Sequence, residues 1–351
     1  MTPAKWFHAL PDGRIQCDLC PRECRLADGQ RGMCFVRARA GDRMELTTYG
    51  RSSGFALDPI EKKPLAHFYP GTSVLSFGTA GCNLACKFCQ NWDISKSREH
   101  DRLTDEASPE AIARAAKRSG AASVAFTYND PTIFTEYAMD TADACHAMGI
   151  KTVAVTAGYI HAEPRAELYA KIDAANVDLK AFTDDFYWKQ AAAHLEPVKE
   201  TLRYLVRETT VWTEITTLLI PGLNDSDTEL HELAIWVASE LGPDVPLHFS
   251  AFHPDYKLQH IQPTPLATLQ RARAIAKAEG LRFVYTGNVH DREGDTTSCA
   301  SCGAPVIVRD WYQIVESNLD QGRCGSCKMP IPGRFDAQIG NFGRRRMRVV
   351  V

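Results

Sequence analysis

The stretch Gly81-Cys82-Asn83-Leu84-Ala85-Cys86-Lys87-Phe88-Cys89-Gln90-Asn91 decides how this chain is interpreted. It places three cysteines at the spacing C-x3-C-x2-C, directly after the apolar run 74–77. Cysteine thiolates hold iron–sulfur clusters, and a four-iron cluster normally takes four of them. Because no fourth cysteine stands at a matching spacing, one iron of a cluster bound here would lack a protein ligand. We therefore predict a catalytic cluster on Cys82, Cys86 and Cys89, with one iron open to a small molecule.

A zinc knuckle is the main alternative for these cysteines. Zinc sites usually combine two C-x2–4-C pairs, whereas this triad is compact and isolated, with the aromatic residue Phe88 before its last cysteine. In this spacing the triad resembles the signature of the radical S-adenosylmethionine (SAM) superfamily. The resemblance implies that the amino and carboxylate groups of SAM chelate the open iron of a [4Fe-4S] cluster. It also implies that a 5′-deoxyadenosyl radical derived from SAM abstracts hydrogen from a substrate.

The composition is that of a globular protein with no strong electrostatic preference. The chain has 351 residues, of which 44% are hydrophobic and 24% are charged, and its net charge is -3. Such a balance does not favour nucleic acid or an anionic membrane, and the arginine-rich tail 344–348 is expected to be solvated or paired with carboxylates rather than to bind nucleic acid. No apolar run approaches the ~20 residues that span a bilayer. The start of the chain, 1–11, lacks a signal-peptide core, so we expect a cytoplasmic protein.

Metal ligation is the expected role of most of the cysteines. The chain has 12 cysteines, and the cytosol keeps thiols reduced rather than paired in disulfides. Only Cys145 stands apart, on a helical apolar face, where we expect a buried residue without chemistry. The others form three groups: Cys17, Cys20, Cys24 and Cys34; Cys82, Cys86 and Cys89; and Cys299, Cys302, Cys324 and Cys327.

The flanking groups predict two further metal sites. The first lies in a Cys-rich N-terminal extension, 1–70, and tetrahedral sulfur ligation suits both zinc and an auxiliary iron–sulfur cluster there. Cys20-Pro21 resembles the end of bacterial ferredoxin motifs, although the spacing differs. The second lies in a C-terminal module, 291–351, where two C-x2-C pairs favour zinc over an auxiliary cluster in a small, zinc-ribbon-like β-rich unit. A unit of this size buries little apolar surface and needs such a metal.

Between these flanks, residues 71–290 alternate short apolar runs with amphipathic helices. Such alternation indicates an α/β fold in which helices cover a parallel sheet, and the resemblance implies a partial (βα)6 barrel. Ser108 with Pro109, Ser226 with Glu229, and Thr264 with Pro265 mark three helix starts. The predicted strands are 74–77, 123–127, 152–156, 176–179, 211–219, 246–250 and 282–285.

Polar residues at the strand ends are the candidates for binding the cofactor, because such folds place their chemistry there. Asp130 is expected to cap the helix that begins at Pro131. The resemblance implies a second role, since 128–131 stands where related enzymes carry a Gly-Gly-Glu-Pro segment that binds the ammonium group of SAM. Asp178 and Lys180 share a face, where opposite charges must be paired or used. The full set of candidates is Phe88, Asn129, Asp130, Thr156, Asp178, Lys180, Thr216 and His248, the last of which could instead bind substrate, donate a proton or be a core histidine.

A narrower resemblance covers nearly the whole chain, and it is to the AmmeMemoRadiSam system radical SAM enzymes, which relate to pyruvate formate-lyase activating enzymes. It implies two companion proteins, one of them Memo-like, and a reductant such as flavodoxin or ferredoxin. Three positions depart from the family pattern: Asp130 replaces a Glu, Ala157 replaces a common Asn, and 191–194 replaces a glycine-containing turn. The segments that carry the resemblance are 17–22, 81–84, 126–129, 177–180, 219–225, 248–250 and 285–289.

Three functions are consistent with these motifs. The first is a radical SAM enzyme that abstracts hydrogen from an unidentified substrate. The second is an activating enzyme for a glycyl-radical enzyme; activases with extra ferredoxin-like clusters carry cysteines soon after the triad, and none occurs here between Cys89 and Cys145. The third is a non-enzymatic interaction protein organised by zinc ribbons, which would contain zinc and no iron.

Overall fold

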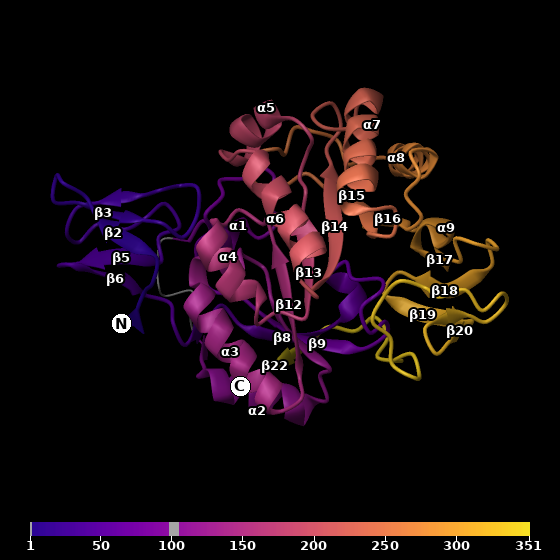
Figure 1. The fold of residues 1–351 in the computed structure, drawn as a ribbon, viewed down its shortest axis with the longest axis horizontal. Helices are drawn as coiled ribbons and strands as arrows, with labels where there is room; N and C mark the ends of the chain where they lie inside the picture. The colour runs from indigo at the N-terminus through magenta and orange to yellow at the C-terminus, as the bar shows by residue number, and fades with distance from the viewer. Residues whose placement is uncertain (1, 98–104) are drawn as a thin grey trace.

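The structure of the protein is a computed structural model that describes residues 2–97 and 105–351. Its centre is a nine-stranded mixed sheet with the order β16-β15-β14-β13-β12-β11-β9-β8-β22 (Figure 1). The first seven strands in this order are parallel, and β8 and β22 are antiparallel to their neighbours. The parallel strands are β9 (Ser73–Phe77), β11 (Ser123–Phe126), β12 (Lys151–Thr156), β13 (Ala174–Asp178), β14 (Trp212–Leu219), β15 (Leu247–Ala251) and β16 (Val284–Gly287).

Each of these seven strands falls within or overlaps one of the predicted apolar runs. The two antiparallel strands come from the flanks of the chain: β8 (Phe55–Pro59) precedes the parallel series, and β22 (Met347–Val349) lies near the C-terminus. The chain therefore has an α/β fold with a mixed sheet, and both flanking regions contribute a strand to it.

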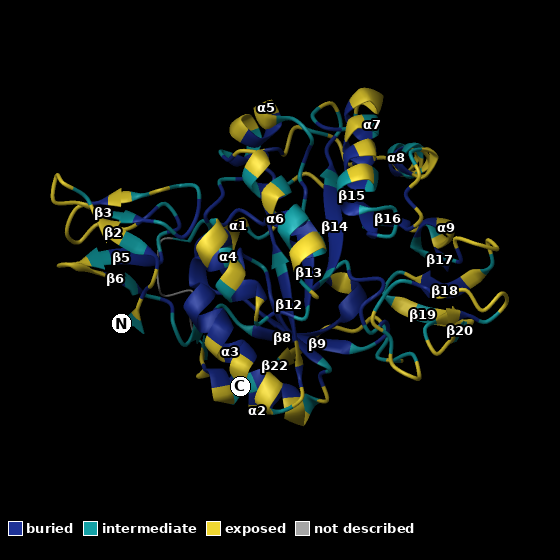
Figure 2. Cartoon of the chain, in the orientation of Figure 1, coloured by how far each residue is buried: buried dark blue, intermediate teal, exposed yellow. Residues whose placement is uncertain are grey.

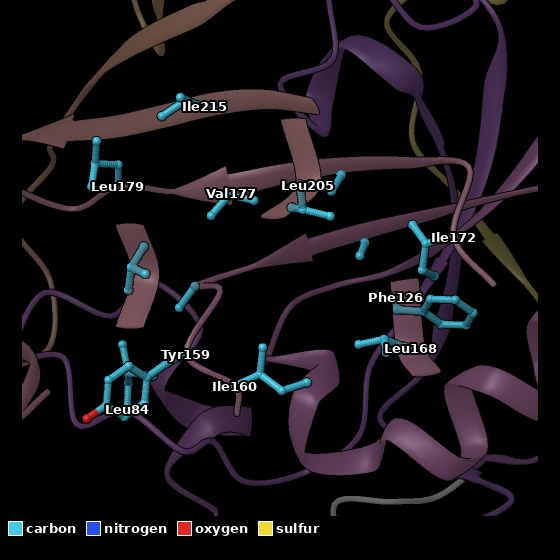
Figure 3. Packing of buried hydrophobic residues seen from close by; sticks show 14 of the residues in the cluster. Leu84, Phe126, Tyr159, Ile160, Leu168, Ile172, Val177, Leu179, Leu205 and Ile215 are labelled. Carbon is cyan, nitrogen blue, oxygen red and sulfur yellow. The ribbon is translucent and has the colours of Figure 1, made fainter. Parts of the chain in front are cut away.

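Helices alternate with the parallel strands and pack against the sheet. Figure 2 shows that their outer faces are exposed, whereas the strands beneath them are buried. Figure 3 shows part of the apolar core, in which Val177 of β13, Ile215 of β14 and Leu205 of α6 are completely buried. The main helices are α2 (Pro109–Ser119), α3 (Thr135–Ala147), α4 (Ala162–Tyr169), α6 (Glu196–Glu208), α7 (Asp227–Trp236) and α8 (Leu266–Ala278).

Two of the three predicted helix starts have the expected cap. Ser108 accepts a hydrogen bond from the backbone N–H of Ala111, and Ser226 accepts one from Glu229. Thr264 is no cap, because its hydroxyl donates to the carbonyl of Leu219 and accepts from the N–H of Phe252. It therefore joins the end of β14 to the segment that follows β15, and α8 begins without a side-chain cap.

The flanking regions are rich in short strands. The N-terminal region contains the sheets β2-β3-β4 and β1-β6-β5, and the C-terminal region contains β17-β18-β19 and the pair β20-β21. In the described ranges we find no helix with the length and apolar character needed to cross a membrane. These strands are β1 (Thr2–Pro3), β2 (Phe7–Ala9), β3 (Ile15–Cys17), β4 (Arg25–Leu26), β5 (Arg37–Ala40), β6 (Arg43–Leu46), β17 (Thr297–Ser298), β18 (Pro305–Asp310), β19 (Gln313–Ser317), β20 (Leu319–Asp320) and β21 (Arg323–Cys324).

Candidate active site

The cysteine triad lies in the loop after β9, at the ends of the parallel strands. Cys82, Cys86 and Cys89 line a cavity of about 260 Å³. The same cavity is lined by seven of the eight residues predicted to bind the cofactor, namely Phe88, Asn129, Asp130, Thr156, Asp178, Lys180 and Thr216. Phe88 belongs to the triad loop itself, and the topology brings the other six to this loop because they lie in or just after neighbouring strands of one parallel sheet. The eighth, His248, lies elsewhere and is described below.

The triad has the character of a cluster site rather than a single-ion site. Among the described residues, the three sulfur atoms do not all lie within 4.8 Å of one another. Around one tetrahedral zinc, sulfur atoms would lie about 3.8 Å apart, since each Zn–S bond is about 2.3 Å. A wider arrangement fits a cluster, in which each thiolate binds its own iron. Burial raises the pKa of Cys82 to about 12, so that a metal must displace its proton.

Asn129 holds the triad loop in place. Its side-chain oxygen accepts a hydrogen bond from the N–H of Thr79 at 3.0 Å, and its amide nitrogen donates to the carbonyl of Gly81 at 2.9 Å. The residue before the triad is therefore tied to the end of β11. Both polar atoms of this amide are used inside the protein.

Asp130 likewise holds a neighbouring turn in place, the one that follows β12. It accepts the capping hydrogen bond from the N–H of Thr132, as predicted, and a further one from the N–H of Ala157 at 2.8 Å. The hydroxyl of Thr156 lies 3.1 and 3.2 Å from its two oxygens. This carboxylate therefore fixes the turn after β12 against the start of the 3-10 turn Pro131–Phe134.

Asp178 and Lys180 form an ion pair at the cavity wall. The Lys180 Nζ atom lies 2.8 Å from Asp178 Oδ2 and 5.9 Å from the centre of the Phe88 ring. Burial opposes the charge on this lysine, but the attraction of Asp178 outweighs it and raises the pKa of Lys180. The cavity therefore contains a permanent cation.

Thr216 supplies an unused polar group. Its hydroxyl oxygen is buried, and it has no hydrogen-bond partner among the described residues. A buried hydroxyl without a partner is costly. Because it lines the same cavity as the triad, its position fits a polar ligand bound there.

A second, larger cavity of about 490 Å³ adjoins the first. The two cavities share Gln90, Asn91, Thr127, Tyr128, Ser250 and Asn288 as lining residues. His248 lines only the larger one, together with Tyr285 of β16 and with Arg309 and Trp311 of the C-terminal region. The larger cavity therefore lies between the strand ends and the C-terminal region.

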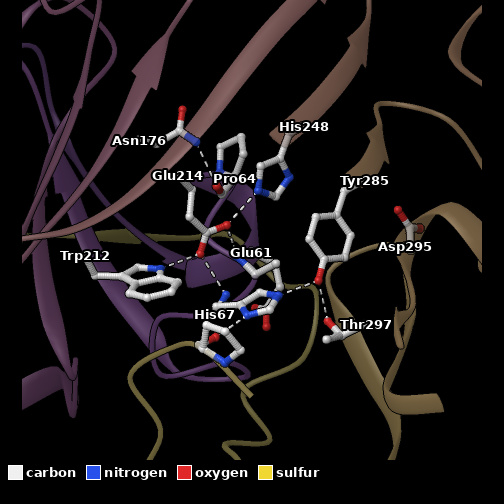
Figure 4. Close-up of polar contacts among 12 residues, drawn as sticks. Glu61, Pro64, His67, Asn176, Trp212, Glu214, His248, Tyr285, Asp295 and Thr297 are labelled. Atoms are coloured by element: carbon white, nitrogen blue, oxygen red, sulfur yellow. Dashed lines mark hydrogen bonds and ion pairs between the residues drawn. The ribbon is translucent and has the colours of Figure 1, made fainter. Parts of the chain in front are cut away.

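The polar network behind His248 was not predicted from the sequence. Figure 4 shows Glu214 of β14 at its centre. This carboxylate is completely buried and accepts hydrogen bonds from Trp212 Nε1 at 2.9 Å and His248 Nε2 at 2.7 Å. The backbone N–H groups of Ala66 and His67 donate two more. The alternation that places Glu214 on the same face of its strand as Thr216 is the signal that could have found it.

His67 and Tyr285 complete this network. Both nitrogens of the His67 ring make hydrogen bonds. Nδ1 donates to the carbonyl of Pro332 at 2.6 Å, and Nε2 lies 2.5 Å from the Tyr285 hydroxyl. The ring of Tyr285 stacks on that of His248, with centroids 5.0 Å apart. Because Nε2 of His248 donates to a carboxylate, its Nδ1 is the lone-pair nitrogen of the neutral ring. No hydrogen bond from a described residue occupies that atom.

The C-terminal cysteines form a compact tetrad. The Sγ atoms of Cys299, Cys302, Cys324 and Cys327 all lie within 4.8 Å of one another, and in the described part of the chain no other set of three or more such ligands does. The Cys299–Cys327 and Cys302–Cys324 sulfur distances are 3.5 and 3.8 Å. Both match the spacing of about 3.8 Å that a tetrahedral ion with bonds of about 2.3 Å would impose.

The sequence matches a known family model and a known relative. The model of the Radical SAM superfamily matches residues 77–234. The chain is 41% identical over 329 residues to the uncharacterized protein MJ0808 of Methanocaldococcus jannaschii. The matched region covers 93% of this chain and 98% of that protein. A radical SAM methyltransferase from Sphaerobacter thermophilus has a TM-score of 0.49 at 20% identity, over 68% of this chain and 71% of that one. A domain of a pyruvate-formate lyase-activating enzyme from Bacteroides vulgatus has a TM-score of 0.42 at 20% identity, over 47% of this chain and 99% of that one.

Proposed function

Because this chain belongs to the radical SAM superfamily, we propose that it is an enzyme that abstracts hydrogen from a substrate held in the larger cavity. The observation that carries this proposal is the common cavity, in which three cysteines, Phe88 of the same loop and six polar residues in or just after the strands meet. When bound, a [4Fe-4S] cluster and SAM supply a 5′-deoxyadenosyl radical. The residues of the chain hold, orient and enclose these groups.

Each wall of the smaller cavity has a proposed task. Cys82, Cys86 and Cys89 hold the cluster, and Lys180 offers a cation to the carboxylate of SAM. Thr216 offers a hydroxyl without a protein partner. Asn129 and Asp130 position the loops that carry these groups, because their polar atoms already bind the backbone of neighbouring turns.

The larger cavity is the proposed substrate site. Its volume of about 490 Å³ suits a small molecule, and it shares a wall with the SAM cavity. His248, held by buried Glu214 at 2.7 Å, presents a ring nitrogen that can take a proton from a bound substrate or return one. We place His248 on the substrate side rather than in the SAM site.

The narrower assignment to the AmmeMemoRadiSam enzymes is also part of this proposal. The segments that carry that resemblance include 126–129, 177–180, 248–250 and 285–289, and each contributes lining residues to one or both cavities. A Memo-like companion and a flavodoxin or ferredoxin reductant are the partners that follow. Binding of the purified companion to this protein, measured by analytical ultracentrifugation, tests the first of them.

The test of the proposed function is SAM cleavage. Anaerobically reconstituted protein is mixed with SAM and dithionite, and 5′-deoxyadenosine is measured by chromatography. We expect its formation by the wild type and a loss of at least about 100-fold when Cys82, Cys86 and Cys89 are all replaced by alanine, because losing even a partner of a metal ligand costs up to about 100-fold. Cys145→Ala is the matched control, because this cysteine is buried on α3 and lines neither cavity. Wild-type protein with a full complement of iron that forms no 5′-deoxyadenosine would contradict the proposal.

A further inference from the structure

The N-terminal cysteines surround one small cavity. Cys17 ends β3, Cys20 and Cys24 lie in the turn between β3 and β4, and Cys34 precedes β5. All four line a space of about 10 Å³. The backbone closes this loop on itself, since the N–H of Cys17 donates to the carbonyl of Cys24 at 3.0 Å. We propose that these four thiolates hold a second [4Fe-4S] cluster, and not a zinc ion.

The spacing of the sulfur atoms carries this inference. No three of the four N-terminal sulfur atoms lie within 4.8 Å of one another, whereas all four C-terminal ones do. Four sulfur atoms held about 2.3 Å from a single zinc ion would lie about 3.8 Å from one another. The N-terminal tetrad is therefore too open for one ion, and the C-terminal tetrad provides an internal standard for a closed site.

The same comparison favours four irons over two. In a two-iron cluster the thiolates bind in pairs on each iron, but in a four-iron cluster each thiolate has its own iron. The C-terminal tetrad shows sulfur–sulfur contacts of 3.5 and 3.8 Å. Among the described N-terminal cysteines no sulfur–sulfur hydrogen bond of this kind is found, and Cys24 Sγ instead accepts one from the N–H of Met33.

A buried cation faces the N-terminal cavity. Arg37 is 1% exposed, and its Nε atom has no hydrogen-bond partner among the described residues. The other nitrogens of this guanidinium bind Glu136 at 2.8 and 3.0 Å and the carbonyl of Lys5. Arg37 lines the cavity together with the four thiols. An unused N–H beside buried sulfur fits an anionic metal–thiolate group, which needs hydrogen bonds and positive charge.

This site packs directly against the loop that carries the catalytic triad. A side-chain carbon on Gly81 would lie 2.0 Å from the carbonyl oxygen of Cys34. On the same side, Arg22 Nε donates to the carbonyl of Asn83 at 2.7 Å. The second cluster would thus order the segment on which residues 81–83 rest, and this role does not depend on how SAM is used.

Metal content tests the inference. The full-length chain is reconstituted anaerobically with ferrous iron and sulfide, and iron, sulfide and zinc are measured for each chain. We expect about eight irons in the wild type, because each four-iron cluster adds four. The variant in which Cys82, Cys86 and Cys89 are all replaced by alanine should keep about four irons and a reduced-cluster electron paramagnetic resonance signal that SAM does not change.

The complementary variant replaces Cys17 and Cys34 by serine. It should lose about four irons and keep a cluster signal that SAM changes. Should this variant fail to fold, the triad variant still decides the question, because its N-terminal region is intact. Zinc in place of iron in the triad variant, about two irons, or no metal at all would overturn the proposal. None of these results depends on whether the protein cleaves SAM.

Discussion

At the scale of single residues, the most consequential features are buried charges that the sequence pattern does not reveal. Glu214 is fully buried, which by itself would raise its pKa, but the hydrogen bonds from His248 and Trp212 hold the pKa below its usual range. The carboxylate is therefore an anion that fixes the tautomer of His248. Alternation along the strand can predict that Glu214 faces inward. The four hydrogen-bond donors to its carboxylate, however, come from three separate segments of the chain. Such a network depends on tertiary structure, so sequence alone could not supply it.

His67 gives a pH prediction at this scale. Burial lowers the pKa of His67 to about 4, whereas an unfolded histidine has a pKa near 6.5. Because the folded-state pKa is depressed, the contribution of the neutral ring is fully present above pH 6.5. It is lost as the pH falls toward about 4, since the unfolded chain then binds the proton. We expect the free energy of unfolding to fall with a slope of up to about 1.4 kcal/mol per pH unit from this residue alone.

The measurement is chemical denaturation of anaerobic protein between pH 7.5 and about 5, compared with His67→Asn. At pH 7.5 the His67→Asn variant is expected to have a lower free energy of unfolding than the wild type, because it loses the hydrogen bond to Tyr285. Its free energy of unfolding is expected to fall less steeply as the pH is lowered. Loss of metal at low pH affects both proteins equally. His260→Asn is the control, because His260 is exposed and should leave the slope unchanged. Equal slopes for wild type and His67→Asn would contradict the assignment.

At the scale of elements, local signals predicted most of the fold. Seven apolar runs became the seven parallel strands, and the caps at Ser108 and Ser226 were confirmed. These succeed because caps and strand hydrophobicity act over a few residues. Thr264 failed because its hydroxyl binds Leu219, which lies 45 residues away in the chain. For Asp130 the sequence predicted only the helix cap. Its hydrogen bonds with Thr156 and Ala157 could not be predicted, because they depend on the neighbouring strand.

Gly81 gives a prediction at the scale of the triad loop. Its φ of +84° is in the left-handed region, and an added methyl group would meet the Cys34 carbonyl at 2.0 Å. Gly149, after α3, has a φ of +73° with nothing within 4 Å of the same position. Gly149→Ala should therefore lower the free energy of unfolding only through the strained backbone conformation, by about 1–2 kcal/mol. Gly81→Ala must in addition push two loops apart, so we expect a clearly larger loss in the free energy of unfolding.

The two variants are compared by denaturation and by iron content after reconstitution. Gly81→Ala should also bind less iron than the wild type, because the displaced loop carries Cys82. Gly149→Ala should bind as much iron as the wild type. If both variants lost equal stability and kept full iron, the contact between the N-terminal region and the triad loop would be of no consequence.

At the scale of the whole molecule, the flanking regions complete the central fold. The C-terminal region supplies β22 to the sheet, and it contacts the segment 66–71 repeatedly. Arg309 donates to the carbonyl of Ala66 at 2.6 Å, and the N–H of Tyr69 donates to the carbonyl of Arg334 at 2.7 Å. Its residues Arg309 and Trp311 line the larger cavity but not the smaller one. The C-terminal region thus contributes to the wall of the proposed substrate site, whereas the proposed SAM site is lined by residues of the sheet and of the triad loop.

The C-terminal tetrad therefore gives a prediction in which stability and SAM cleavage separate. The apolar cluster around it is small, with Val306, Ile307 and Ile331 as its buried aliphatic residues, so we expect a bound ion to stabilise the region. Structural zinc in small domains contributes on the order of 10 kcal/mol of binding free energy. We expect the wild type to contain about one zinc at this site, and Cys324→Ser to lose it and unfold at a lower temperature. SAM cleavage should fall by less than about threefold, since this cysteine lines neither cavity.

Mass spectrometry of metals, thermal unfolding and 5′-deoxyadenosine formation are measured together on the same preparations. Ser301→Ala is the matched control, because Ser301 is exposed and adjoins Cys302 without being a ligand; it should keep both zinc and stability. A wild-type protein with iron at this site would mean that the sulfur spacing of 3.5 and 3.8 Å does not report a single zinc ion. If Cys324→Ser lost SAM cleavage to the same extent as it lost zinc, the folded C-terminal region would be needed to keep the central sheet in its active conformation. Because β22 pairs with β8 beside the strand that precedes the triad, this second result would locate the coupling at that edge of the sheet.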